Sequence, residues 1–144
     1  AQAYPIWQSL VDDAAKVDDP ELYARAYGAA ALATHTLGKG DPVSRLAECG
    51  RLAQHAGIPE VAARCHGAIA ERPGDIEVRA REARTAFGLA PADAATVYAL
   101  YAVAVDAFNG DRMELALELA KLARPNAGAL AEALDKLIAA ASAE

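Results

Sequence analysis

The sequence has few of the residues with which small proteins form stabilising disulfide bonds or structural metal sites. It contains two cysteines, one methionine and one tryptophan, and aromatic residues make up only 6% of its 144 positions. Two cysteines exclude a dense disulfide framework. Neither a CxxC pair, an HExxH motif, a GxSxG motif nor a phosphate-binding loop occurs. The sequence therefore predicts a protein without a catalytic motif, a metal or a bound cofactor, stabilised by its apolar core.

Long apolar runs are also missing. No stretch approaches the roughly 20 apolar residues that a membrane-spanning helix needs. The most apolar segment, 94–108, contains Asp106 near its end and is better interpreted as a buried helix. We therefore predict no membrane span. A cytoplasmic location is expected, and an exported or periplasmic one is the alternative if Ala1 is the product of a signal peptidase.

The chain has fewer basic than acidic residues. Lys and Arg number 14 against 20 Asp and Glu, which gives a net charge of −6. An acidic surface repels phosphate backbones, and no basic stripe compensates for it. Nucleic acid is therefore excluded as a predicted partner.

Helix-forming residues dominate what is present. Hydrophobic residues make up 54% of the chain, and many of them are alanine. Proline and glycine recur where helices would begin and end, and no segment alternates with a period of two. These patterns predict an all-α fold with helices over 4–17, 20–37, 42–56, 59–71, 75–87, 91–108, 111–123 and 126–142.

A repeat organises these helices. The dipeptide Gly-Asp occurs at Gly40-Asp41, Gly74-Asp75 and Gly110-Asp111, at separations of 34 and 36 residues. Each pair falls in a short turn between two predicted helices. Such a period indicates stacked helical hairpins, each of which cannot bury its apolar face alone.

The middle unit carries a family resemblance. It has a small residue midway along its first helix, a Gly-Asp turn, an apolar residue, alanines in its second helix and a proline near its end. These are Gly67, Gly74-Asp75, Ile76, Ala83, Ala86 and Pro91. The pattern resembles the tetratricopeptide repeat, over about residues 20–125, with degenerate motifs. Arg79 stands where that family prefers alanine.

The resemblance implies an architecture. We expect one domain over 1–144, built as an α-solenoid of about three stacked helix hairpins. The expected parts are a flanking helix at 4–17, repeats at about 20–57, 58–90 and 91–125, and a capping helix at 126–143.

The resemblance also implies a function. The first helices of such hairpins line a concave groove that binds a helix or peptide segment of another protein, as in chaperone, assembly or regulatory scaffolds. The family's groove positions fall on Tyr27, Thr34, Val61, Arg64, Ala68, Tyr98 and Val105, with Tyr101 and Asp106 close by. For the tyrosines, ordinary core packing is an equal alternative. Asp106 is expected to face solvent or the groove, rather than to be a buried acid with a shifted pKa.

Cys49, Cys65 and His66 form the remaining candidate cluster. Each cysteine lies eight residues from Gly57, in the turn between two antiparallel helices, so both should sit at the same height along the hairpin. Two free buried thiols are the favoured interpretation. A disulfide and a weak metal or redox site are the alternatives.

Two other classes of function remain open. A helical chain of this size could hold a small molecule or a haem, with His35 or His66 as an axial ligand. It could also act as a self-associating homo-oligomeric scaffold through exposed end faces around Trp7 or Leu134.

Overall fold

The computed structural model describes residues 3–37 and 42–143, and in these ranges it is all-helical, with no strand. The all-α prediction is confirmed. The helices are α1 (Ala3–Ala14), α2 (Pro20–Leu37), α3 (Pro42–His55), α4 (Pro59–Glu71), α5 (Ile76–Leu89), α6 (Ala94–Asn109), α7 (Met113–Ala123) and α8 (Ala131–Ser142), with 3-10 turns η1 (Arg124–Asn126) and η2 (Gly128–Leu130) before the last. The first Gly-Asp turn, Gly40-Asp41, lies outside the described residues. No helix in the described ranges is long and apolar enough to cross a membrane.

Local capping sets where these helices begin. The side chain of Asp19 accepts a hydrogen bond from the Leu22 amide at the start of α2. α6 begins at Ala94 rather than at the predicted Pro91, because Asp93 caps the Ala95 amide. α7 begins at Met113 rather than at Asp111, which has the left-handed φ of 62°.

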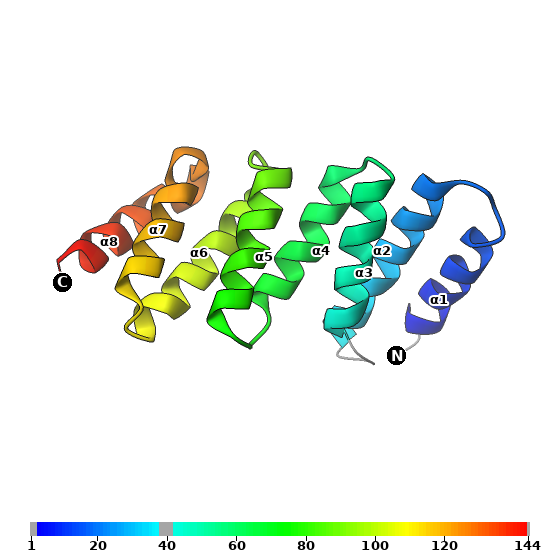
Figure 1. The fold of residues 1–144 in the computed structure, drawn as a ribbon, viewed down its shortest axis with the longest axis horizontal. Coiled ribbons are helices and arrows are strands. Elements are labelled where there is room, and N and C mark those ends of the chain that lie inside the picture. The colour runs from blue at the N-terminus through cyan, green and yellow to red at the C-terminus, as the bar shows by residue number, and fades with distance from the viewer. Residues whose placement is uncertain (1–2, 38–41, 144) are drawn as a thin grey trace. The chain divides into compact units, whose positions relative to one another are not determined.

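Two compact units make up the chain, Ala1–Ile69 and Ala70–Glu144, and the boundary between them falls within α4. Within each unit, helices that follow one another in sequence pack as antiparallel neighbours (Figure 1). In the second unit α6 also contacts α8, two helices further along the chain. The single domain over 1–144 stays a prediction.

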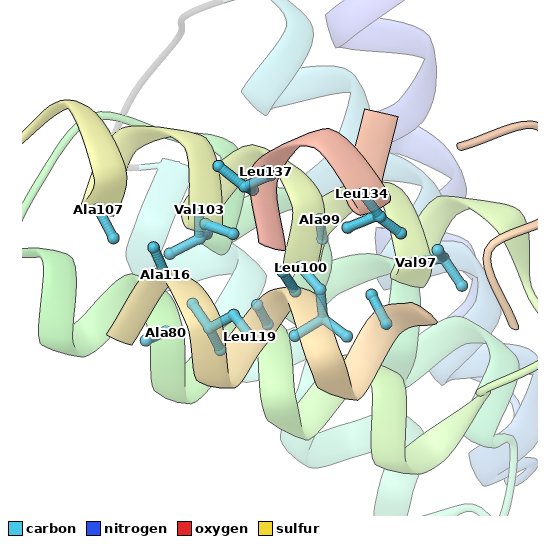
Figure 2. Packing of buried hydrophobic residues seen from close by; sticks show 14 of the residues in the cluster. Ala80, Val97, Ala99, Leu100, Val103, Ala107, Ala116, Leu119, Leu134 and Leu137 are labelled. Carbon is cyan, nitrogen blue, oxygen red and sulfur yellow. The ribbon is translucent and has the colours of Figure 1, made fainter. Parts of the chain in front are cut away.

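Alanine fills much of each core. In the second unit buried side chains from α5, α6, α7 and α8 form one cluster, and Figure 2 shows those of α6, α7 and α8 meeting around Leu100 and Leu119. Leu134 is fully buried there, so the expectation of an exposed end face around this residue is wrong. In the first unit the core cluster includes Leu46, Cys49, Cys65 and Ile69.

Contacts at a nearly constant sequence separation run through both units. Arg25 binds Glu60 35 residues further on, and Arg45 donates to Gln8 at a separation of 37. In the second unit three more polar contacts, Arg112–Glu77, Arg84–Glu118 and Asn126 to the Pro91 carbonyl, join residues 34 or 35 apart. Residues about one repeat apart in sequence are therefore neighbours in space within each unit.

Candidate functional site

The predicted groove residues of the first unit are mostly covered. Thr34 is fully buried, and its hydroxyl donates to the Ala30 carbonyl at 2.8 Å. Ala68 is also buried, while Tyr27 and Val61 are half-buried against the core of this unit. Burial raises the pKa of the Tyr27 hydroxyl. Arg64 alone among these five is exposed.

The predicted groove residues of the second unit share a hollow. Tyr98, Tyr101, Val105 and Asp106 lie at successive turns along one side of α6. With three further residues they line a cavity of about 390 Å³, which we call the acidic hollow. Its lining residues are Glu71, Arg79, Tyr98, Tyr101, Ala102, Val105 and Asp106.

Burial of the other side of α6 holds these residues in place. Val97, Leu100, Val103 and Ala107 are all buried in the core that Figure 2 shows. Since α6 is fixed on that side, the residues on its remaining side project from a rigid support. Tyr98 is half exposed, at 50%, whereas Tyr101 and Val105 pack partly against the core.

Two tyrosine rings form one wall of the acidic hollow. The ring centroids of Tyr98 and Tyr101 are 6.4 Å apart, and their planes are inclined by 52°. Tilted pairs at this separation are favourable for aromatic side chains. The pair therefore offers a preformed aromatic surface beside the two carboxylates of the hollow.

Arg79 on α5 connects three elements. Its Nε donates to the Ala70 carbonyl of α4 at 2.8 Å, and its Nη2 lies 2.8 Å from Oδ2 of Asp106 on α6. The Arg79 side chain is 11% exposed and that of Asp106 is 50% exposed. The expectation that Asp106 reaches solvent at the hollow is confirmed, but its buried cationic partner was not foreseen. The one available signal was that Arg79 replaces the alanine of the family pattern.

Glu71 is the second carboxylate of the hollow. It ends α4, and no basic residue occurs in the last turn of that helix. Partial burial raises the pKa of its carboxyl group. Within the described residues no hydrogen bond or ion pair to this carboxylate is found. Glu71 therefore carries a desolvation cost that no neighbouring cation offsets.

A second hollow adjoins the first. It has a volume of about 580 Å³ and is lined by α6 together with α8 and the turn before it. We call it the α8 hollow; its lining residues are Tyr101, Val105, Ala129, Glu132, Ala133, Lys136 and Leu137. Tyr101 and Val105 line both hollows. The two adjacent hollows together are named the α6 groove.

The α6 groove is mixed in character. Glu132 and Lys136 of the α8 hollow form an ion pair at 3.2 Å with both side chains largely exposed. Apolar area comes from Val105, Ala133 and Leu137. The arrangement can bind a segment that supplies apolar contacts and at least one polar or charged group.

The cysteines form a disulfide. Cys49 of α3 and Cys65 of α4 are bonded, with their Cα atoms 6.2 Å apart, and both are fully buried. The favoured interpretation as two free thiols is wrong. The predicted equal height is confirmed, because only residues level with each other across the hairpin can be bridged.

His66 lies next to this disulfide on α4 but packs elsewhere. Its Nε2 is 3.4 Å from the Gln54 Oε1 atom. It also lies 2.6 Å from the place where a Cβ atom on Gly50 would be. A Cβ atom on Gly28 would meet the Val61 side chain at 2.9 Å, so side chains lie close against the backbone at both glycines. The described residues contain no group of three or more His, Cys, Asp or Glu that could hold a metal ion.

Comparison of the chain with protein families, with curated proteins and with solved structures gives no match.

Proposed function

We propose that the chain is a protein-interaction module made of tetratricopeptide-like helix hairpins. In this proposal the α6 groove binds one segment of a partner protein, and the chain acts by binding rather than by catalysis. The carrying observation is that two adjoining hollows share Tyr101 and Val105 on one helix.

The regular contacts support the hairpin stack. In a solenoid each repeat touches only its neighbours, so polar pairs recur at about one repeat length. The pairs Arg112–Glu77 and Arg84–Glu118, at separations of 35 and 34 residues, have this property. The contact of α6 with α8 also fits, because in the proposed register α8 is the capping helix that follows the hairpin begun by α6.

The character of the groove supports a peptide ligand. Tyrosine combines a rigid apolar ring with a polar tip and is enriched among residues that dominate binding energy. Tyr98 is half exposed yet belongs to a helix whose opposite side is buried, so its position is fixed without being covered. An extended or helical segment lying along α6 would contact both hollows.

A peptide-display selection tests this proposal. A random dodecapeptide library is selected on the immobilised wild-type protein, and the enriched peptides are measured against variants by fluorescence anisotropy. Tyr98→Ala should weaken binding by about tenfold or more, the loss of one interfacial aromatic anchor. Its helicity and melting temperature should stay close to wild type, since half of the side chain is already in water.

Leu122→Ala is the matched control. Leu122 is an exposed apolar side chain of α7, at 38%, and does not line the α6 groove. Its truncation should leave peptide affinity unchanged. Equal affinity of Tyr98→Ala and wild type for every enriched peptide would show that the groove is not the binding surface.

A further inference from the structure

Resting on the proposed function, we propose that the acidic hollow is a specificity subsite for a basic side chain, arginine or lysine, of the bound partner segment. The cation would lie against the Tyr98 and Tyr101 rings, between the carboxylates of Glu71 and Asp106.

Charge complementarity begins with Asp106. The Arg79 guanidinium forms an ion pair with the Oδ2 atom of Asp106, and no second partner is found for this carboxylate within the described residues. An ionised carboxylate accepts hydrogen bonds at both oxygens. Arg79 also lines the hollow, but its side chain is 11% exposed and that of Asp106 is 50% exposed, so a ligand there meets more of the carboxylate than of the guanidinium. The buried arginine thus fixes the acid while leaving it free to bind a second donor.

The surroundings of Glu71 disfavour the ionised form of its carboxyl group, and a nearby cation would favour that form. The C-terminal end of a helix carries partial negative charge, which disfavours a carboxylate in the last turn. Glu71 also shares the hollow with a second acid, Asp106. Partial burial adds a desolvation cost, and among the described residues no ion pair is found for this carboxylate. A ligand ammonium or guanidinium between the two acids would offset these costs by its attraction to both carboxylates.

The tyrosine pair selects the same chemistry. A cation within about 6 Å of an aromatic centroid is attracted by the negative face of the ring. Tyr98 and Tyr101 both line the hollow that contains the carboxylates, with centroids 6.4 Å apart. A planar guanidinium can stack on one ring while donating to a carboxylate. Acidic and aromatic groups therefore converge on one ligand group.

The occupant is a peptide rather than a free cation because the hollow is not isolated. It shares Tyr101 and Val105 with the adjacent α8 hollow, whose walls include Ala133 and Leu137. A basic residue held in the first hollow would place apolar neighbours of the same segment in the second. The recognised sequence should then combine one basic position with apolar positions a few residues away.

Two variants of equal charge test the inference. The probes are an enriched display peptide and a second peptide in which its basic residue is replaced by glutamine. The basic peptide should bind wild type about tenfold more tightly, the order of one close charge pair or cation–aromatic contact. Glu71→Gln should abolish most of that difference, whereas Glu114→Gln, an exposed carboxylate of α7 outside the groove, should preserve it.

The outcomes separate the two proposals. The basic subsite would be overturned if binding of an enriched peptide depends on Tyr98 but replacing its basic residue with glutamine leaves its affinity unchanged. The peptide groove would then stand. A difference that Glu71→Gln does not reduce would also overturn it. Selection that enriches no sequence would overturn both proposals. N-acetyl-arginine amide binding as tightly as the full peptide would overturn the commitment to a protein segment.

Discussion

Arg79 and Asp106 form an ion pair at 2.8 Å in which the cation is buried and the anion is half exposed. The pair joins α5 to α6, and the same guanidinium reaches the Ala70 carbonyl at the end of α4. A buried charge is tolerated only when it is paired and hydrogen-bonded. The pair therefore links the stability of the second unit to the shape of its acidic hollow.

Replacing Arg79 with alanine should destabilise the protein by about 2–4 kcal/mol, because it leaves a buried carbonyl without its donor and removes the packing of the long side chain. Urea unfolding followed by circular dichroism measures the change. Arg81→Ala is the control, since Arg81 is an exposed residue of the same helix with only a 4.0 Å contact to Glu82. Its effect should stay within about 0.5 kcal/mol. Equal effects of the two substitutions would contradict the structural role of Arg79.

Replacing Glu71 with glutamine should raise the melting temperature at neutral pH while weakening binding of a basic peptide. The pKa of the Glu71 carboxyl is raised in the folded state. Between the ordinary and the raised pKa, the folded protein therefore binds more protons than the unfolded chain. Stability is therefore lost as pH rises from the ordinary glutamate pKa, about 4.3, through the raised pKa. Glutamine removes this loss, so the difference between variant and wild type should disappear below pH 4. Melting curves at several pH values would contradict this if the difference were constant.

Removing the disulfide should lower stability without abolishing the helical fold. Cys49 and Cys65 are separated by 16 residues, and closing a loop of that size contributes about 3 kcal/mol by restricting the unfolded chain. The double variant Cys49→Ala with Cys65→Ala should show this loss in urea unfolding under oxidising conditions. Reductant should lower the stability of the wild type but leave that of the double variant unchanged. A reductant effect of the same size in both would show that the cysteines are not the cause.

Two glycines inside helices should respond to alanine in opposite directions. A Cβ atom on Gly50 would lie 2.6 Å from the His66 ring, so Gly50→Ala should be destabilising despite the better helix propensity of alanine. Gly88 lies in α5 with nothing within 4 Å of its Cβ position. Gly88→Ala should therefore stabilise the protein by up to about 1 kcal/mol. Thermal unfolding of the two variants measures the contrast, and a shift of the same sign in both would contradict it.

Helix positions followed closely from the sequence because the signals are local. Proline, glycine and aspartate set the ends of α2, α3 and α4 within a residue or two of their predicted bounds. The prediction was less accurate where two signals compete. Pro91 favours a helix start, but the Asp93 side chain caps the next turn, and α6 begins after it. The last helix begins at Ala131 rather than 126, because the chain first makes two 3-10 turns around Gly128, whose φ is 53°.

The candidate site was predictable only in part. Tyr98 and Val105 were assigned from the groove positions of the family that the sequence resembles, and Tyr101 and Asp106 were added because they lie close by on the same predicted helix. The groove residues of the first unit came from the same repeat register, and there Thr34 and Ala68 are buried.

Contacts between side chains on different helices could not be predicted from local sequence patterns. Arg79 and Asp106 lie on different helices, so no spacing rule within one helix connects them. The equal distances of Cys49 and Cys65 from Gly57 fixed their height along the hairpin, but not whether the sulfur atoms bond.

The constant separation of the polar contacts has a consequence for folding. Arg25–Glu60, Arg84–Glu118 and Asn126–Pro91 each close a loop of 34 or 35 residues, so these contacts demand no long chain closure. The entropy lost on closing a loop grows only slowly with its length, so each such contact adds a similar and limited cost. Within each unit, one hairpin can form first and serve as a template onto which the next helix condenses.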